Sequence, residues 1–558
     1  MTDPLGRTTS WAHDIQGRVK CKEYADGSKV TYLYENTTSR LRQRIDEKLQ
    51  VTQYNYNRDD TVSQICYTNA TVATPPVAFV YDAHYSRLRS MTDGTGTTHY
   101  GYIPINAATS LGAGQLASVD GPLPDGTITF SYDELGRRVS TAINEVASSV
   151  TYDAAGRVIT STNALGLFTN TYDGSSFRVA SQTCPNGQTA EFDYAGNLQD
   201  QHLQEITNKL GDTSISKFIY GRDVTTGQIT SWSQQADTET TLIYDLAYDS
   251  GDQLTAATVS AQGNVVNNFS YSYDPAGNRL TEQVDATTRQ FSYNALNEMT
   301  SIKGDASLEA DYQWDAEHRL ISVTSGNEKT EFTYDGLGRR VGIRFLVSGT
   351  EVSDRRYTWC DNEICEERTP AGIVSKRFFV QGMKIESGAV AGAYFYSRDH
   401  LGSIRQLTDS SGSVRASYAF DPFGRQERIA GDLEADFGFA GMFWTSEIEL
   451  NLTLFRAYDP SIGRWLSRDP LRDAEVEEGP NLYLYAGNNS VNATDLLGLA
   501  ECCKKEADDL DRPSLLHSFC VAWYHNDYSK CDVLEPVIRA ALVAYIKCMK
   551  KCNPKCLR

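Results

Sequence analysis

The side chains best suited to chemistry by type gather at the C-terminal end of the chain. Seven of the 12 cysteines lie in the last 59 residues, namely Cys502, Cys503, Cys520, Cys531, Cys548, Cys552 and Cys556. Such a density indicates either a disulfide scaffold or a metal site. Zinc could be held with the help of His517 or His525, but no CxxC pair of the kind common in zinc sites occurs. Because the number is odd, at least one thiol is left over or pairs with another chain.

Two predicted helices must position these cysteines. Asp511 can cap the first helix, and Asp532 with Glu535 has capping-box spacing for the second. Apolar residues at helical spacing follow each cap: Leu515, Leu516, Phe519, Cys520 and Trp523, then Leu534, Ile538, Leu542, Tyr545 and Met549. A unit this small needs cross-links to be stable. Its loop "WYHNDYSKC" resembles the His/Asp pairs of small hydrolases, although a solvated loop is the commoner structure.

The remaining 499 residues have a different composition. Residues 500–558 hold ten Lys+Arg and eight Asp+Glu, so the rest of the chain carries 42 and 64 and a net charge of -22. An acidic surface repels phosphates, which argues against nucleic-acid binding by this body. Its five cysteines are scattered, which favours a reduced compartment in which they serve as small buried hydrophobes. The basic end of the tail suits an anionic membrane or a nucleic acid, or simply a solvated helix end.

Neither a membrane span nor a signal peptide is visible. No apolar run approaches the roughly 18 residues of a transmembrane helix, and "MTDPLGRTTSWAHD" lacks a basic region followed by an apolar one. This start already resembles a turn of the repeat described next, so we expect a trimmed or naturally short chain. No cofactor-binding motif is present, and we expect no cofactor.

A short motif of the form aromatic-Asp-x-x-Gly-Arg recurs through the body. It begins at Tyr132, Tyr152, Tyr172 and Phe192, each 20 residues apart. It returns at Tyr248, Tyr273, Tyr293, Trp314 and Tyr334, in steps of 25, 20, 21 and 20 residues. Weaker copies start at His13 and Tyr81. A fixed period of this length is typical of repeat architectures.

One repeat predicts one β-hairpin. Between two motifs, Val139, Thr141 and Ile143 alternate with polar residues, and the segment from Val146 to Tyr152 alternates again. The Asp opens the turn, the Gly supplies a positive φ, and the Tyr packs on the neighbouring repeat while its hydroxyl stays hydrated. Stacked hairpins form one long sheet that must coil, so we predict an all-β, curling shell. The stretch 198–245 has no clean copy and is expected to be an insertion with a short helix.

From about Tyr394 a second set of motifs begins. In order these are "DHLGS", "FDPFGR", "R.YDP..GR.LS.DP" and "NLY.Y..NN..N..D..GL". They resemble the RHS-repeat-associated core domain, and the preceding repeats resemble RHS (YD) repeats. The resemblance covers roughly residues 1–499. It implies a hollow β-shell of spiralling hairpins over residues 1–393, a core domain over 394–499 that acts as autoprotease and end plug, and a variable, cysteine-rich cargo over 500–558.

The same resemblance implies where the chain would be cut. Many family members cleave themselves after the Leu of the final motif by an aspartyl-protease-like mechanism, here between Leu499 and Ala500. The carboxylates would be Asp469 of "SRDP" and Asp495 of "TDLLGL", with Arg468 as the adjacent basic residue. Two carboxylates held close together cannot easily both ionise, so one can act as acid and the other as base. Without the resemblance, both aspartates would be read as turn residues.

Two positions depart from the family pattern. Leu496 stands where the family has proline, and Ser490 replaces another proline. A leucine frees one backbone angle and adds an N–H, which could loosen the segment that precedes the cut.

Three functions are consistent with these motifs. The first is a self-cleaving shell that encloses residues 500–558 as a toxin or effector, made in the bacterial cytoplasm and then secreted or delivered to the cell surface. A secretion system or toxin-complex partner would close the N-terminal end. The alternative is a non-cleaving, teneurin-like adhesion or carbohydrate-binding protein, and the third is an inactive or incomplete member.

Overall fold

The computed structural model describes residues 1–499, apart from 106–109, 237–239, 305–309, 472–473 and 478. Within this part the chain is almost entirely β-structure, arranged in antiparallel sheets of 26, 12 and 4 strands. The predicted helical, cysteine-rich segment 500–558, with its disulfide and zinc alternatives, lies outside the described residues. No helix in the described part is long and apolar enough to cross a membrane.

The 26 strands of the first sheet follow one another in chain order, each paired with the next. They are β1 (Ser10–His13), β2 (Val19–Glu23), β3 (Lys29–Tyr34), β4 (Leu41–Ile45), β5 (Val51–Tyr56), β6 (Val62–Thr68), β7 (Val77–Tyr81), β8 (Leu88–Asp93), β9 (Gly96–Tyr102), β10 (Leu116–Asp120), β11 (Ile128–Tyr132), β12 (Arg138–Ile143), β13 (Val146–Tyr152), β14 (Val158–Asn163), β15 (Gly166–Tyr172), β16 (Val179–Thr183), β17 (Gln188–Tyr194), β18 (Leu203–Leu210), β19 (Thr213–Arg222), β20 (Ile229–Ala236), β21 (Leu242–Tyr248), β22 (Leu254–Ala261), β23 (Asn264–Tyr273), β24 (Arg279–Val284), β25 (Thr287–Tyr293) and β26 (Met299–Lys303).

The second sheet continues the same meander. It consists of β27 (Asp311–Trp314), β28 (Leu320–Ser325), β29 (Glu328–Tyr334), β30 (Arg340–Val347), β31 (Thr350–Cys360), β32 (Glu363–Arg368), β33 (Val374–Phe379), β34 (Gly382–Ile385), β35 (Gly392–Arg398), β36 (Ile404–Asp409), β37 (Val414–Phe420) and β38 (Gln426–Gly431). The third sheet consists of β39 (Phe443–Thr445), β40 (Leu450–Leu452), β41 (Ala457–Asp459) and β42 (Arg464–Trp465). The helical elements are η1 (Asn197–Gln199), η2 (Phe439–Gly441), α1 (Ala474–Glu477) and η3 (Ala486–Asn488).

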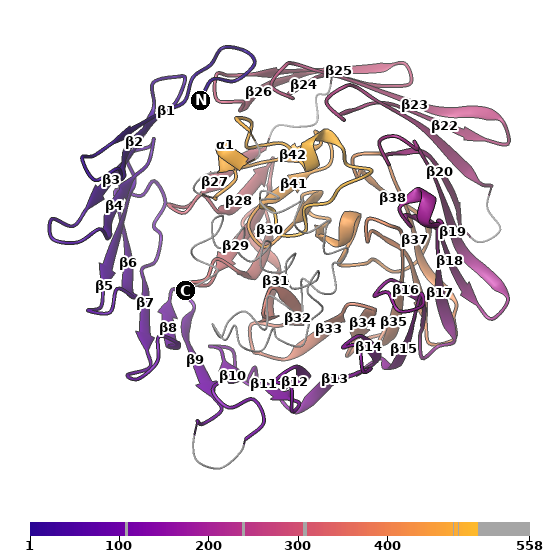
Figure 1. The fold of residues 1–558 in the computed structure, drawn as a ribbon, viewed down its shortest axis with the longest axis horizontal. Helices are drawn as coiled ribbons and strands as arrows, with labels where there is room; N and C mark the ends of the chain where they lie inside the picture. The colour runs from indigo at the N-terminus through magenta and orange to yellow at the C-terminus, as the bar shows by residue number, and fades with distance from the viewer. Residues whose placement is uncertain (106–109, 237–239, 305–309, 472–473, 478, 500–558) are drawn as a thin grey trace.

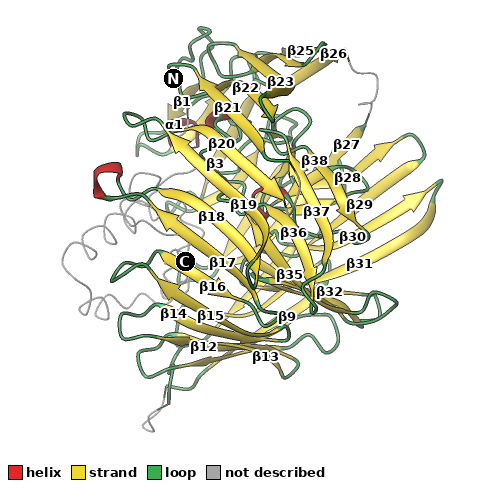
Figure 2. Cartoon of the chain, turned by 90° about the vertical axis from the view of Figure 1, so that its right-hand side faces the viewer, coloured by secondary structure: helices red, strands yellow, loops and turns green. Residues whose placement is uncertain are grey.

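The first sheet forms a ring. In Figure 1 it runs from β1 round the outside of the molecule until β25 and β26 lie beside the N-terminus, and β39–β42 lie inside the ring. The ends meet through Arg7, which donates a hydrogen bond to the Asn294 carbonyl at 3.2 Å. Figure 2 shows β27–β32 to one side of β16–β21, as expected for a second turn offset from the first. The predicted all-β, spiralling shell is thereby confirmed.

Polar contacts hold the second sheet, which is the second turn of the spiral, on the first sheet. The Gly336 N–H donates to Asp93, and Arg368 donates to the carbonyls of Pro124 and Asp125 at 2.8 Å each. Further along, Asn186 donates to the carbonyl of Asp409 at 3.1 Å. Strand β35 crosses residue 394, where the core domain was expected to begin, without a break in the sheet.

The repeat motif forms a turn that is tied to the next hairpin. Asp133 Oδ1 accepts the N–H groups of Leu135 (2.9 Å) and Arg137 (2.8 Å), and Gly136 has φ +75°. Arg137 Nε donates to Asp133 Oδ2 at 2.7 Å, and its guanidinium lies 4.2 Å from the ring centre of Tyr152. The predicted hairpin is present as β12 and β13. A cation–π contact thereby joins this turn to the tyrosine of the following one, and the arginines of several other turns make the same contact, such as Arg157 with Tyr172 and Arg319 with Tyr334.

The expectation that the tyrosine hydroxyls stay hydrated is wrong. Tyr152 donates to the carbonyl of Arg138 at 2.8 Å, which lies at the start of the preceding strand. The same bond to a carbonyl 14 to 19 residues earlier is made by Tyr34, Tyr56, Tyr102, Tyr132, Tyr172, Tyr194, Tyr248, Tyr273, Tyr293 and Tyr334. The hydroxyl thus satisfies a backbone acceptor where the strand pairing is interrupted at the turn.

The described part of the stretch 198–245 is not an insertion, and its helical content is limited to the short η1. Apart from the short η1, it consists of β18–β21, which continue the sheet without interruption. Inward-facing residues such as Ile206, Phe218 and Trp232 are buried in this part of the sheet. Apolar and polar residues do alternate along these strands in the sequence. The turns between the strands lack the repeat motif, so the strands were not predicted.

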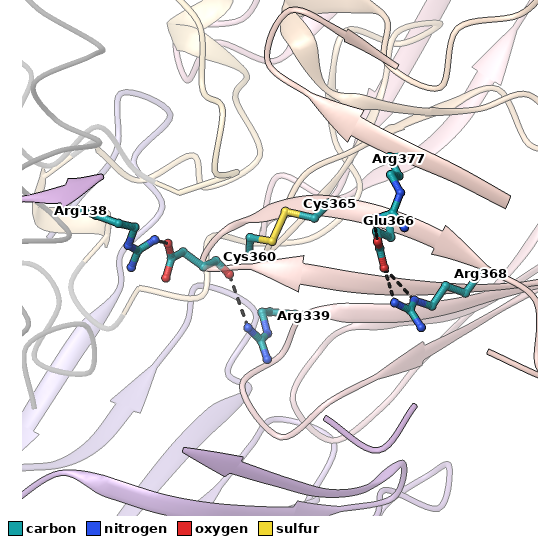
Figure 3. Close-up of a disulfide and its surroundings, with 8 residues drawn as sticks. Arg138, Arg339, Cys360, Cys365, Glu366, Arg368 and Arg377 are labelled. Carbon is teal, nitrogen blue, oxygen red and sulfur yellow. Dashed lines mark hydrogen bonds and ion pairs between the residues drawn. A yellow bond between two sulfur atoms is a disulfide. The ribbon is translucent and has the colours of Figure 1, made fainter. Parts of the chain in front are cut away.

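The body cysteines also depart from expectation. Cys360 and Cys365 form a disulfide near the β31–β32 turn, whereas Cys184 is a buried thiol and Cys21 and Cys66 are half-buried thiols (Figure 3). Cys365 is the extra residue of a β-bulge, because Thr358 pairs with Glu366 while Trp359 pairs with Ile364. Most of these cysteines are therefore not the free buried thiols that the sequence predicted.

Candidate active site

A single arginine lies at the centre of the site. Arg456 follows β40 in a tight turn, in which Thr453 Oγ1 donates to the Arg456 carbonyl at 3.0 Å and accepts the Arg456 N–H at 3.1 Å. The guanidinium is 4.4 Å from the ring centre of Trp465, and the residue is 4% exposed. The turn and the indole together fix the position of a buried charge.

This guanidinium brings the two predicted aspartates together. Arg456 Nη2 lies 3.0 Å from Asp469 Oδ2 and 2.9 Å from Asp495 Oδ2. Its other nitrogens donate to backbone carbonyls, Nη1 to Leu482 at 3.2 Å and Nε to Gly498 at 2.6 Å. The side chain of Asp469 is 0% exposed and that of Asp495 is 9% exposed. Two buried carboxylates therefore share one cation.

Asp495 also holds the backbone just before the proposed cut. Its Oδ1 accepts the N–H groups of Gly498 at 2.8 Å and Leu499 at 3.0 Å. The Phe455 N–H donates to the Leu497 carbonyl at 3.2 Å. Gly498 has φ +71°, and a Cβ built on it would lie 2.2 Å from Thr453 Oγ1. Only glycine fits between this turn and the chain.

Asp469 is positioned by its own loop. Its Oδ1 accepts the N–H of Leu471 at 2.7 Å, and its backbone N–H donates to the Leu482 carbonyl at 3.2 Å. That carbonyl also accepts a hydrogen bond from Arg456. The Asp469 backbone N–H and the Arg456 guanidinium thus both bind the carbonyl oxygen of Leu482.

The environment alters the acidity of Asp495. Burial raises the pKa of its carboxyl to about 6, and the neighbouring Asp469 raises it too. Arg456 and the N–H groups of Leu499 and Gly498 act in the opposite direction but do not offset the burial. A carboxyl with this pKa can hold a proton near neutral pH and release it again.

Arg468 is not part of this cluster. Its guanidinium pairs with Glu47 at 3.0 Å and Glu298 at 3.2 Å, and lies 4.6 Å from the ring centre of Tyr24. The basic residue at the carboxylates is instead Arg456. Arg456 is the first letter of "R.YDP..GR.LS.DP", so the motif contained the signal. Adjacency to Asp469 singled out Arg468, whose side chain instead contacts Glu47 and Glu298.

The two departures from the family pattern lie at different depths. Leu496 is 56% exposed, so its side chain contributes little to the site. Ser490 is buried and donates to the Pro422 carbonyl at 2.5 Å. Leu499 is the last described residue, and Ala500 lies outside the described part.

Family models match two stretches of the chain. The model described as Teneurin YD-shell matches residues 389–491, and the model described as RHS Repeat matches residues 312–344. Two segments of the chain thus match models of the RHS and YD-shell type. The YD-shell match includes Arg456 and Asp469 but ends before Asp495.

Several relatives of this chain are named as nucleases or toxins. The tRNA nuclease WapA of Bacillus subtilis (strain 168) is 29% identical over 250 residues, which is 40% of this chain and 10% of WapA. The double-stranded DNA deaminase toxin A of Burkholderia cenocepacia (strain H111) is 26% identical over 257 residues, 40% of this chain and 18% of that protein. The toxin protein Tse5 of Pseudomonas aeruginosa is 27% identical over 265 residues, 40% of this chain and 19% of Tse5. The matched segment is thus less than a fifth of each relative's length.

The fold is also seen in solved structures. The TcdB2-TccC3 crystal structure matches 88% of this chain with a TM-score of 0.73 at 17% identity, and covers 29% of that longer chain. A Tc holotoxin pore of Photorhabdus luminescens gives a TM-score of 0.72 with the same coverage of this chain and 28% of its own. At this identity the similarity establishes the shell architecture.

Proposed function

We propose that this protein is an RHS repeat shell that cuts its own chain between Leu499 and Ala500 and holds residues 500–558 as a toxin or effector. The observation that carries the proposal is Asp495, which shares Arg456 with Asp469 and accepts the N–H of Leu499. A carboxyl pair is thereby anchored directly to the residue before the cut.

The two aspartates have distinct roles in the proposed hydrolysis. Asp469 takes a proton from a water molecule as its oxygen attacks the Leu499 carbonyl carbon. Asp495, protonated below its raised pKa, donates its proton to the departing nitrogen of Ala500. Asp469 ends protonated and Asp495 ionised, the new carboxyl of Leu499 releases the second proton of the water to solvent, and Ala500 becomes a free amine, so atoms and protons balance.

Arg456 supports this chemistry in two ways. It stabilises the ionised member of the carboxyl pair, and its Nε holds the Gly498 carbonyl one residue before the cut. Because the scissile bond belongs to the same chain, the site needs no substrate-binding affinity. Intramolecular presentation contributes an effective concentration of order 10⁵ M or more in well-oriented cases.

The shell is proposed to enclose its cargo until delivery. Toxin names among the relatives support a toxic cargo, and the spiral of two turns supports enclosure. We further propose production in the bacterial cytoplasm, delivery outside the cell, and a partner that closes the N-terminal end. The acidic body, with a net charge of -22 against +2 for the tail, makes it a poor binder of nucleic acid.

Intact-mass spectrometry of the purified protein under denaturing conditions tests the cut. We expect two polypeptides, residues 1–499 and 500–558, which co-purify before denaturation. A single chain of full mass after prolonged incubation would contradict the proposal and favour the non-cleaving adhesion alternative. Expression of residues 500–558 alone in bacteria, compared with the full chain, tests whether the cargo is harmful and the shell protective.

A further inference from the structure

The ring of the first sheet closes where its first and last turns meet. The early side carries Tyr24, in the turn between β2 and β3, and Glu47, in the turn between β4 and β5. The late side carries Glu298, in the turn between β25 and β26. We call these three residues the closure site. They come from parts of the chain about 250 residues apart, so they meet only after the ring has formed.

Arg468 joins both sides of the closure site. Its Nη1 donates to Glu47 at 3.0 Å and its Nη2 to Glu298 at 3.2 Å. Its guanidinium lies against the ring of Tyr24, and Tyr483 donates to the same Glu298 oxygen at 3.3 Å. The Arg468 side chain is 16% exposed, that of Glu47 19% and that of Glu298 44%. A half-buried guanidinium without these carboxylates would be left poorly solvated.

Arg468 is also the chain neighbour of Asp469. Two backbone bonds hold the segment 465–469 against 482–483, since the Trp465 N–H donates to the Tyr483 carbonyl (3.1 Å) and the Asp469 N–H to the Leu482 carbonyl (3.2 Å). The two neighbouring side chains have different partners. Arg468 contacts Glu47 and Glu298 at the closure site, whereas Asp469 contacts Arg456.

We propose that Arg468 is a positioning residue that makes the cut conditional on ring closure. Held by Glu47 and Glu298, it fixes the segment that carries Asp469 against the Leu482 carbonyl, and so places the Asp469 carboxylate beside Asp495. In a chain whose ring is open, Glu47 and Glu298 are apart, and the segment that carries Asp469 lacks the anchor that Arg468 provides. The cargo is then released from the chain only inside a completed shell. This inference rests on the proposed self-cleavage.

The rate of the cut in newly made chains tests the proposal. Chains are produced by cell-free synthesis, synthesis is stopped, and the fraction cut is followed on denaturing gels. Arg468→Met and the double variant Glu47→Gln/Glu298→Gln keep Asp469, Asp495 and Arg456 intact. We expect each to cut about 10- to 100-fold more slowly, the range that a misplacement of about 1 Å produces.

The combination of these substitutions separates positioning from general destabilisation. If Arg468 acts through the two glutamates, Arg468→Met/Glu47→Gln/Glu298→Gln should cut no more slowly than Arg468→Met alone. Arg468→Lys, which keeps the charge, should recover part of the rate. Circular dichroism and the melting temperature of each variant show that the shell has folded.

A matched control breaks a different ion pair, one that joins the two sheets without involving Asp469 or Asp495. Arg138 pairs with Asp361 across the two turns of the spiral (Figure 3). Arg138→Met/Asp361→Asn should lower the melting temperature but cut within about twofold of the unmodified rate.

The results discriminate clearly. Cutting at the unmodified rate by a folded Glu47→Gln/Glu298→Gln chain would overturn the positioning role and leave the self-cleavage proposal standing. Additive slowing in the triple variant would also overturn it. Failure of the unmodified chain to cut would overturn the proposed function itself, and this inference with it.

Discussion

Asp469 and Asp495 meet at one nitrogen atom, Nη2 of Arg456, although 26 residues separate them in the chain. Replacement of either by asparagine keeps the shape and the backbone hydrogen bonds but removes the ability to exchange a proton. We expect Asp469→Asn and Asp495→Asn each to leave a single uncut chain, a loss of at least about 10²-fold for an essential acid or base. Asp436→Asn is the control, because Asp436 is also buried but pairs with Lys376 at 2.6 Å. Cutting by either test variant at the control's rate would refute the assignment.

Arg456 is expected to matter for both stability and the cut. Arg456→Met leaves two buried carboxyls without their shared cation, and the loss of one member of a buried pair costs about 3–5 kcal/mol. We expect an uncut chain and a melting temperature several degrees lower. Arg377→Met offers a comparison, since Arg377 pairs with the buried Glu366 and also with Glu386 away from the site. That variant should lose stability yet still cut, which gel analysis at a temperature where both are folded can show.

The cut should depend on pH through Asp495. Its pKa of about 6 lies above the ordinary aspartate value of about 3.9, so the proton needed by the departing nitrogen is present below pH 6 and lost above it. We expect the rate to fall about tenfold per pH unit above pH 6. Uncut protein purified in denaturant and diluted into buffers of pH 5–8 supplies the measurement, with tryptophan fluorescence to follow refolding. A rate that rises with pH across this range would exclude Asp495 as the acid.

The same shift has a consequence for stability. A carboxyl whose pKa is raised on folding stabilises the shell fully below about pH 4, and this contribution is lost as the pH rises through 6. Two pH units correspond to about 3 kcal/mol. Asp495→Asn, which does not titrate, should therefore lose less stability than the uncut Asp469→Asn chain between pH 4 and pH 7. Equal loss in thermal melts of the two variants would indicate that another group dominates.

Gly498 should tolerate no side chain. Gly498→Ala would place a Cβ 2.2 Å from Thr453 Oγ1 and distort the chain next to Leu499. Gly479→Ala carries the same kind of positive φ, +95°, but has open space around it. Both variants include a strain of about 1 kcal/mol, so the difference between them isolates the clash. We expect only Gly498→Ala to cut slowly, at about a tenth of the unmodified rate or less.

The disulfide Cys360–Cys365 should stabilise the contact between the two turns. It packs on the apolar cluster of Ile128, Phe130, Tyr132 and Ile143 in the first turn, next to the Arg138–Asp361 pair. A short disulfide loop contributes about 2 kcal/mol by limiting the unfolded chain. A reductant should lower the melting temperature of the unmodified chain by a few degrees. It should have the same effect in Cys66→Ser but none in Cys360→Ser/Cys365→Ser.

Much of this fold could be predicted from the sequence because each repeat motif forms its turn through contacts within the motif. Asp133, Gly136 and Arg137 form a turn with local contacts, so spacing alone located the hairpins. The strands around Phe218 could not be located in this way, because their turns use other residues and the sheet is held by inward-facing side chains.

Less of the candidate site than of the fold could be predicted from the sequence. The order of motifs placed Asp469 and Asp495 as candidates, but only the three-dimensional packing shows that Arg456 connects them. It also shows that Arg468 belongs to the closure of the ring. Arg456 lies in the turn before β41 and Arg468 follows β42, and spacing from the aspartates does not reveal which of the two contacts them.

Eleven tyrosine hydroxyls of the described chain, among them those of Tyr34, Tyr152 and Tyr334, donate backwards to a carbonyl 14 to 19 residues earlier. Tyr152 at the end of β13 thus bonds the first residue of β12, so the hydroxyl closes its own hairpin and needs no residue still to be synthesised. The shell can be laid down in the order in which the ribosome delivers it, with every new hairpin fastened on arrival. Asp495, near the end of the described chain, is reached only when nearly all of these fastenings are in place.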